Sequence, residues 1–191
     1  MRTRNGNWLA VGAVAVITVV ALFFGNWFVS SQAEASGASD VEVSGVVDPP
    51  KVGDVAPSFE AVDLDGAAVS LEALRGKPVW VLFVATWCAQ CRIEAPDVQS
   101  AHMERDDVDV IAVYLSESPR TVGEYAERVG LTFPQLPDPS TDIAAAYGVR
   151  AIPAHYFVDE EGVVNEVLVG ALSDEQINDA IDRLVGDSAS S

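Results

Sequence analysis

The only two cysteines of the chain, Cys88 and Cys91, are separated by two residues in the stretch ATWCAQC. A Cys-x-x-Cys pair can be a redox-active dithiol, half of a zinc site or a structural disulfide. Cys88 directly follows an apolar stretch and stands where a helix is expected to begin, so unpaired N–H groups and the helix dipole would stabilise its thiolate. We therefore expect Cys88 to attack a partner disulfide, and Cys91, one turn further in, to resolve the mixed disulfide.

The alternatives to a redox dithiol need features that the sequence supplies poorly. A structural zinc ion needs four ligands, and only His102 and His155, on separate predicted elements, could join the cysteines. A structural disulfide is compatible with an exported domain, but closing so short a loop constrains the unfolded chain little. Inert buried thiols would be threatened in an oxidising compartment. A redox pair is therefore the favoured interpretation. We expect Trp87 to lie beside it as a flat apolar surface, and we expect the site to need no metal or cofactor.

Two apolar stretches frame the cysteines. Residues 78–85, PVWVLFVA, and 108–115, VDVIAVYL, are rich in β-branched residues and predict strands buried on both faces. The other predicted elements are helices over about 88–105, 119–129, 139–148 and 173–185, and hairpins that turn at Asp65-Gly66 and Glu161-Gly162. This order predicts one α/β domain with a mixed central sheet.

The first thirty residues differ from the rest of the chain. Arg2 and Arg4 precede residues 8–29, a run of 22 residues without a charge, which is long enough for the roughly 30 Å hydrocarbon core of a membrane. By the positive-inside rule, residues 30–191 lie outside the cytoplasm. The run exceeds the usual apolar region of a signal peptide, so an uncleaved anchor over 1–30 is favoured over a cleaved signal. We expect a single-pass protein of the cell membrane, with its N-terminus cytoplasmic and its domain extracytoplasmic.

The remainder divides into three parts. Residues 31–50 are small and acidic, end in prolines and predict a flexible tether; residues 51–186 form the predicted domain, and residues 187–191 a disordered tail. Residues 31–191 hold 9 basic and 29 acidic side chains, which gives a net charge of −20. A surface this negative repels nucleic acid and anionic lipid, so nucleic acid is excluded as a partner.

The stretch WCAQCRIEAP after an apolar strand, with GVRAIP downstream, resembles the site of thioredoxin-fold thiol–disulfide oxidoreductases. The stretch KVGDVAPSFEAVDLDGAAVSL resembles the added N-terminal hairpin of the membrane-anchored TlpA/ResA-like branch, among the redoxin and AhpC/TSA-related proteins. The resemblance covers about residues 51–186 and implies a thioredoxin fold, in which helices flank a central mixed sheet and an N-terminal β-hairpin is added. It implies that Cys88 is the nucleophile, Cys91 the resolving thiol, Trp87 a flanking contact for clients and Pro96 a kink in the helix.

The resemblance also assigns residues beyond the cysteines. Pro153 matches the proline whose peptide bond is cis in this fold, and it would turn the Ile152 backbone toward the cysteines, where a client strand can pair with it. Glu94 matches an acid that lies near the cysteines in ResA-like proteins; partly buried, it would have a raised pKa and exchange a proton with Cys91. A solvated surface glutamate is the alternative. His155, in a segment where the family often has Thr, is either close to the site or a packing residue.

Four functions compete at this point. The prediction is reduction of disulfides in exported proteins, such as apocytochrome c before haem attachment, with electrons from a membrane thiol transporter. The same site run as an oxidant or isomerase differs only in reduction potential. A peroxiredoxin-like peroxidase would need Pro and Thr seven and three residues before the cysteine, where this chain has Val81 and Ala85. A copper chaperone would use Cys88, Cys91 and His155, but relatives that carry copper space their cysteines one residue wider.

Overall fold

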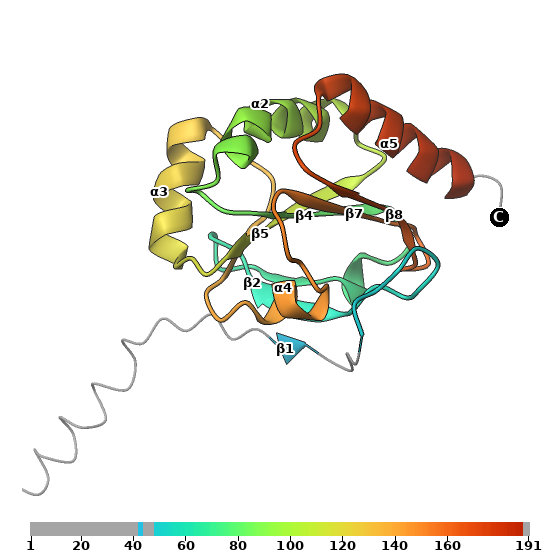
Figure 1. Cartoon of the computed structure of the whole chain (residues 1–191), viewed down its shortest axis with the longest axis horizontal. Coiled ribbons are helices and arrows are strands. Elements are labelled where there is room, and N and C mark those ends of the chain that lie inside the picture. Colours follow the sequence, from blue (N-terminus) through green and yellow to red (C-terminus); the bar gives the residue numbers. More distant parts are fainter. Residues whose placement is uncertain (1–41, 44–47, 189–191) are drawn as a thin grey trace, which may run out of the picture. The chain divides into compact units, whose positions relative to one another are not determined.

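The computed structural model describes residues 42–43 and 48–188 (Figure 1). The predicted membrane anchor over 1–30 and most of the predicted tether over 31–50 lie outside this part of the chain. Among the described residues, no helix is long and apolar enough to cross a membrane. Anchoring and export therefore stay predictions.

Five strands form the central sheet, in the order β6-β5-β4-β7-β8. They are β4 (Val79–Val84), β5 (Asp109–Leu115), β6 (Gln135–Asp138), β7 (Ala154–Val158) and β8 (Val164–Val169). β4 is parallel to β5, and β5 to β6, whereas β7 is antiparallel to both β4 and β8. The sheet is therefore mixed, as predicted, and the apolar β4 at its centre is buried over its whole length.

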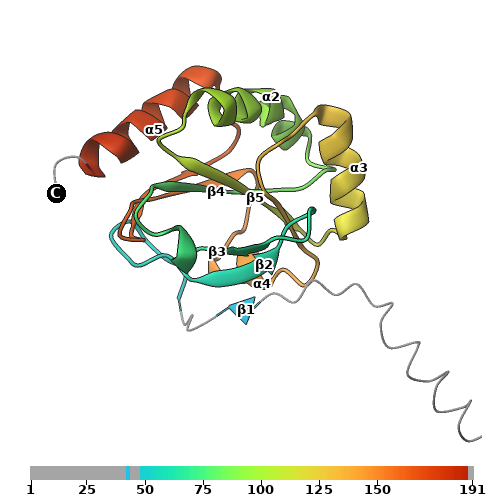
Figure 2. The same ribbon diagram turned by 180° about the vertical axis from the view of Figure 1, so that it is seen from behind.

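Side chains alternate along β4 between two cores, one on each face of the sheet. Trp80 and Leu82 belong to one cluster of buried residues, and Val81 and Phe83 to the other. The helices of the described residues are α2 (Ala89–Glu104), α3 (Pro119–Val129), α4 (Asp142–Ala146) and α5 (Asp174–Ser188), with a short 3₁₀ helix, η1 (Glu72–Leu74). Helices α2, α3 and α5 cover one face of the sheet, and α4 lies on the other (Figures 1 and 2). This arrangement is a thioredoxin fold with helices on both faces.

A second antiparallel sheet lies on the same side as α4 (Figure 2). It consists of β1 (Glu42–Val43), β2 (Phe59–Val62) and β3 (Ala68–Ser70). β2 and β3 form the predicted N-terminal hairpin, and its turn contains Gly66 with a φ of 81°, a conformation that glycine adopts without strain. The short β1 lies within 31–50 and pairs with β2, so two residues of the predicted tether join this sheet.

Strand β6 has no counterpart among the predicted elements. Its four residues include Pro137, which has no N–H to donate to a sheet. β6 lies at the edge of the sheet and pairs with β5 alone, and a proline is tolerated on an edge strand. Because the strand is short and contains proline, its sequence carries no strand signal, and its pairing with β5 is a tertiary property.

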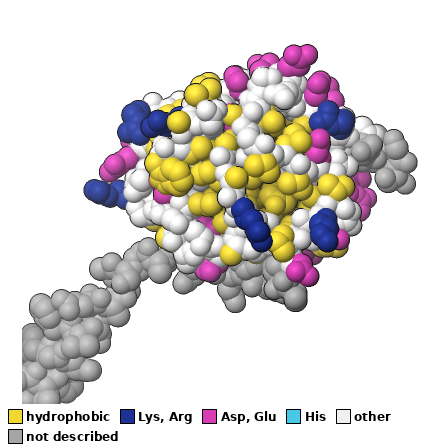
Figure 3. Space-filling model, viewed as in Figure 1, with side chains coloured by type: hydrophobic (Ala, Val, Ile, Leu, Met, Phe, Trp, Pro, Cys, Tyr) yellow, Lys and Arg dark blue, Asp and Glu magenta, His cyan; other side chains and the backbone are white. Residues whose placement is uncertain are grey.

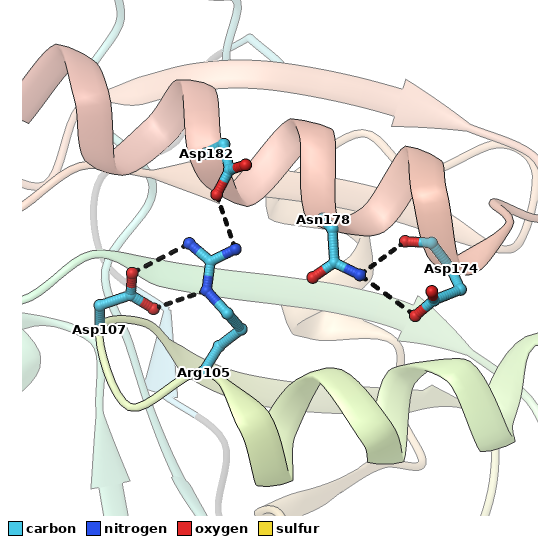
Figure 4. A network of polar contacts seen from close by, with 5 residues as sticks. All are labelled: Arg105, Asp107, Asp174, Asn178 and Asp182. Atoms are coloured by element: carbon cyan, nitrogen blue, oxygen red, sulfur yellow. Dashed lines mark hydrogen bonds and ion pairs between the residues drawn. The ribbon is translucent and has the colours of Figure 1, made fainter.

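The helix that carries both cysteines is held against α5. At the start of α5, the Ser173 N–H donates to Gln176 Oε1 at 3.0 Å and the Gln176 N–H donates to Ser173 Oγ at 3.4 Å, a reciprocal capping box. At the end of α2, Arg105 pairs with Asp107 at 2.9 Å and with Asp182 of α5 at 2.8 Å (Figure 4). These contacts, together with the apolar core between the two helices, fix the direction in which α2 points.

Candidate active site

Cys88 lies in a tight turn between the end of β4 and the beginning of α2. Its backbone N–H donates to the Ala85 carbonyl at 3.1 Å, and Cys88 is the N-cap residue of α2. Cys88 Sγ accepts a hydrogen bond from the backbone N–H of Cys91 at 3.1 Å. A sulfur in this position faces the N–H groups and the positive end of the helix dipole, which stabilise negative charge. The geometry favours the thiolate that disulfide exchange requires.

A disulfide joins Cys88 to Cys91, so the structure shows the oxidised form of the pair. The two residues are 8% and 5% exposed, respectively. This difference in exposure is small, so the distinction between an attacking and a resolving thiol rests on the position of Cys88 at the helix N-terminus. The two roles stay predictions.

The Ile152–Pro153 peptide bond is cis, as the resemblance implied. Pro153 is buried and directly precedes β7, and the Ile152 carbonyl oxygen lies 4.0 Å from Cys88 Sγ. Trp87, on the other side of the turn, is 66% exposed. The structure therefore brings the predicted client-binding residues next to the disulfide, with an aromatic ring in solvent and a half-buried backbone segment beside the sulfur.

Glu94 lies one turn beyond Cys91 and is 1% exposed, so it is not a solvated surface residue. The Leu172 N–H donates to Glu94 Oε1 at 3.3 Å, while Glu94 Oε2 has no hydrogen-bond partner among the described residues. Burial raises the pKa of Glu94 to about 7, because the ionised form is desolvated; the Leu172 hydrogen bond opposes this rise and the charge of Asp97 adds to it. Glu94 therefore changes protonation close to neutral pH.

His155 lies on β7 directly opposite Leu82 of β4 and is fully buried. Its Nε2 is 3.0 Å from the Gly170 carbonyl oxygen, and because a carbonyl can only accept, Nε2 carries the proton of the neutral ring. Burial lowers the pKa of His155 to about 4, although the Gly170 hydrogen bond opposes the change. Within the described part of the chain, His155 Nδ1 and Trp80 Nε1 lack hydrogen-bond partners, and the centroids of these two rings are 5.8 Å apart.

Glu94 and His155 touch, since His155 Nε2 is 3.4 Å from Glu94 Oε1. A pKa of about 7 for Glu94 and of about 4 for His155 means that both side chains are uncharged between these pH values. The contact is therefore a neutral one in this range, and only the carboxyl charges as the pH rises through 7. A buried carboxyl with this behaviour, one turn from Cys91, can accept or return a proton.

A further buried carboxylate supports the cysteine turn and was not identified from the sequence. Glu117 follows β5 and is 6% exposed. It accepts hydrogen bonds from the Thr86 backbone N–H at 2.7 Å and from the Thr86 hydroxyl at 2.5 Å. The available signal was topological: β4 and β5 are adjacent parallel strands, so the residues that follow their carboxyl ends meet at one edge of the sheet.

The structure does not bring the two histidines together with the cysteines as one ligand set. His102 lies near the end of α2, where its ring packs at 5.6 Å from that of Phe133, whereas His155 lies on β7. In the described residues, His, Cys, Asp and Glu side chains form no group of three or more that could hold a metal ion. The structure instead places the buried Glu94–His155 pair close to the disulfide in the chain and the fold, and the catalytic role of Glu94 stays a prediction.

The fold and the site together define a thioredoxin-fold thiol–disulfide oxidoreductase. A Cys-x-x-Cys disulfide at a helix N-terminus beside a cis-proline is the arrangement on which that chemistry depends. The sequence profile described as the AhpC/TSA family matches residues 52–167, and the chain belongs to that family.

The similar proteins carry the same chemistry in their names. The thiol-disulfide oxidoreductase ResA of Geobacillus thermodenitrificans is 33% identical over 135 residues, which are 70% of this chain and 78% of the relative. ResA of Halalkalibacterium halodurans is 28% identical over 188 residues, 96% of this chain and 98% of the relative.

Solved structures agree with these relatives. The crystal structure of a thioredoxin-family thiol:disulfide interchange protein from Chlorobium tepidum has a TM-score of 0.64 at 27% identity, over 74% of this chain and all of that one. A secreted Mycobacterium tuberculosis disulfide oxidoreductase, described as homologous to Escherichia coli DsbE, has a TM-score of 0.58 at 26% identity, over 67% of this chain and 95% of that one.

Proposed function

We propose that this protein reduces disulfides of exported proteins on the extracytoplasmic side of the cell membrane, with apocytochrome c before haem attachment as the leading client. The observation that carries the proposal is the Cys88–Cys91 disulfide at the N-cap of α2, 4.0 Å from the Ile152 carbonyl oxygen. A client strand that pairs with the Ile152 backbone presents its own disulfide to Cys88 Sγ.

The reaction consists of two successive thiol–disulfide exchanges. The Cys88 thiolate of the reduced protein attacks one sulfur of the client disulfide, a mixed disulfide forms and the other client sulfur leaves as a thiolate. The Cys91 thiol gives its proton to Glu94, and the resulting thiolate attacks Cys88 Sγ. The client leaves with two reduced cysteines, and Cys88 and Cys91 form the disulfide. Two electrons have passed to the client, and a membrane thiol transporter returns two electrons to the protein.

The location rests on the N-terminal sequence. Residues 8–29 carry no charge and follow Arg2 and Arg4, which is the pattern of a membrane anchor with a cytoplasmic N-terminus. One structural neighbour is described as secreted, which is consistent with a domain that works outside the cytoplasm. Fusing a reporter that is active only outside the cytoplasm after residue 191, with Arg2 and Arg4 intact or changed to Glu, tests the orientation.

The reduction potential of the Cys88–Cys91 pair tests the direction of the chemistry. We expect equilibration against dithiol buffers to give a value near or below that of thioredoxin, roughly −270 mV. A value close to that of DsbA, roughly −120 mV, would make the protein an oxidant and overturn the proposal. Gln90 stands between the cysteines where many relatives have proline, so the potential has to be measured on this chain.

The client is tested with a peptide that contains the haem-attachment sequence Cys-x-x-Cys-His closed by its own disulfide. We expect the reduced protein to open this disulfide. The Cys91→Ser variant should accumulate a mixed disulfide with the peptide through Cys88, whereas Cys88→Ser should form none. If Cys88→Ser traps the peptide instead, the roles of the two cysteines are reversed.

A further inference from the structure

Positive side chains in the described domain fall into two groups. Five of the nine Lys and Arg side chains within residues 48–188 lie within 4.0 Å of a carboxylate: Arg75, Lys77, Arg105, Arg120 and Arg183. The other four have no carboxylate at that distance in the described part of the chain: Lys51, Arg92, Arg128 and Arg150. With 29 acidic residues in the chain, carboxylates outnumber Lys and Arg side chains, yet these four cations have none within 4.0 Å in the described part of the chain.

Two of these four cations, Arg92 and Arg150, lie next to residues of the site in the chain. Arg92 directly follows Cys91, and Arg150 lies two residues before Ile152, whose carbonyl faces Cys88 Sγ; both arginines are exposed. Arg128 lies over the Tyr125 ring, 5.8 Å from its centroid. The positive charges of Arg92 and Arg128 both act on Tyr125, where they oppose the rise in its pKa that burial causes. Arg92 and Arg128 therefore both lie near Tyr125 of α3, whereas Arg150 lies in the segment that leads to the cis-proline.

Two exposed apolar side chains adjoin Cys88 and Arg92 in the chain. Trp87, immediately before Cys88, is 66% exposed, and Ile93, immediately after Arg92, is 69% exposed. Figure 3 shows apolar side chains across the middle of one face, with Lys and Arg side chains among them and on the α3 side, and acidic side chains gathered over α5. The two carboxylates beside the cysteine turn are buried: Glu94 faces His155, and Glu117 is bonded to Thr86. Neither lies within 4.0 Å of Arg92 or Arg150, although the charge of Glu117 acts on Tyr125, as do those of Arg92 and Arg128.

We propose that the site selects client segments that carry acidic residues on both sides of the disulfide, with Arg92 and Arg150 as the residues that recognise them. This rests on the proposed function and names the class of its substrate. Residues 31–191, with a net charge of −20, repel acidic chains at long range, so an acidic client needs local positive charge where its cysteines must approach. Arginine provides it, because its guanidinium binds carboxylates in a fixed bidentate geometry.

Stabilisation of the Cys88 thiolate is a different role for the same arginines, and an experiment separates the two. A group that stabilises the thiolate changes the rate with every disulfide, including a neutral one. A group that recognises the client changes the rate only with charged clients. Electrostatic attraction also does not depend on which way the electrons flow, so the preference can be measured with the reduced protein and disulfide peptides, or with the oxidised protein and dithiol peptides.

The test uses the full-length protein in detergent and three cyclic disulfide peptides that are identical except for Glu, Gln or Lys on each side of the cysteines. The variant is Arg92→Gln/Arg150→Gln. The control is Lys51→Gln, which removes another cation that has no carboxylate within 4.0 Å in the described part of the chain. Lys51 lies near the start of β8. The other end of β8 pairs with Ala154, which follows Pro153, and β8 is roughly 17 Å long between these ends. A neutral small disulfide, bis(2-hydroxyethyl) disulfide, reports thiolate reactivity.

At low salt we expect the second-order rate constant to be about fivefold higher for the Glu peptide than for the Gln peptide, and lower for the Lys peptide. The preference should shrink at 0.5 M salt, vanish in Arg92→Gln/Arg150→Gln and persist in Lys51→Gln. Equal rates for the three peptides would overturn the proposal and leave the oxidoreductase function intact. If Arg92→Gln/Arg150→Gln slows the reaction with bis(2-hydroxyethyl) disulfide by the same factor as the reaction with the Glu peptide, the arginines stabilise the Cys88 thiolate and do not recognise the client. If the reduced protein reduces none of the four disulfides and the oxidised protein oxidises none of the corresponding dithiols, the proposed function is wrong, and this inference is wrong with it.

Discussion

Replacing Glu94 by Gln gives a quantitative test of the buried carboxyl. Gln keeps the size of the side chain and can still accept the hydrogen bond from the Leu172 N–H, but it cannot ionise. Burial raises the pKa of Glu94 from 4.5 to about 7 in the folded protein. The folded state therefore holds this proton more tightly than the unfolded state, and the contribution to stability is lost as the pH rises from 4.5 through 7.

The magnitude follows from the same values. One pH unit of difference in pKa corresponds to about 1.4 kcal/mol, so ionised Glu94 destabilises the oxidised protein by about 3 kcal/mol above pH 7. We expect Glu94→Gln to have nearly the wild-type free energy of unfolding at pH 4.5 and to be more stable by up to about 3 kcal/mol at pH 8. Glu104→Gln supplies the matched control, because it makes the same substitution at an exposed position of the same helix.

Urea unfolding of the oxidised protein at several pH values measures this difference. A constant difference between wild type and Glu94→Gln from pH 4.5 to 8 would refute the reasoning, because it would mean that Glu94 ionises as a solvated carboxyl does. The same variant should change the kinetics. With a pKa of about 7, roughly 1% of Glu94 is ionised at pH 5 and half at pH 7, so the wild-type resolving step should accelerate about 50-fold over this range. Glu94→Gln should lose the plateau near pH 7.

Three further predictions concern the groups around the site. His155→Leu removes the polar ring whose Nε2 lies 3.4 Å from Glu94 Oε1 and should move the midpoint of the pH–rate profile to higher pH, whereas His155→Asn, which keeps a polar side chain, should shift it less. Thr86→Val removes the hydroxyl that binds Glu117 and should lower the free energy of unfolding in urea by about 1–3 kcal/mol, with Thr86→Ser close to wild type. Ser173→Ala should lower it by about 0.5–2 kcal/mol through loss of the α5 cap, without altering the reduction potential; a changed potential would contradict a purely structural role.

The parts of the site that depend on residues a few positions apart in the chain were predictable from the sequence. Cys88 and Cys91 are one helical turn apart, and the strand before them and the helix after them are encoded by a β-branched apolar run and by the pattern that follows it. The capping box at Ser173 and the turn at Gly66 are local in the same way, since each depends on residues within a few positions.

Other features depend on which elements the fold places together. In the sequence Glu94 is one more charged residue of a helix, and only its burial in the fold, against the Leu172 segment and His155 of β7, desolvates it and raises its pKa. The sequence left His155 with two interpretations, and the register of β7 against β4 places it in contact with Glu94.

The sequence by itself thus determined the dithiol, the elements on each side of it and the excess of negative charge. The tertiary structure alone decided the environment of the dithiol: the buried Glu94–His155 pair, the hydrogen bonds from Thr86 to Glu117, and the approach of the Ile152 carbonyl, two residues after Arg150, to Cys88 Sγ. The physical reason is that burial and electrostatic interaction depend on distances in space. Arg150 is 58 positions from Arg92 in the chain, and His155 is 61 positions from Glu94. These residues belong to one site only when the sheet has formed.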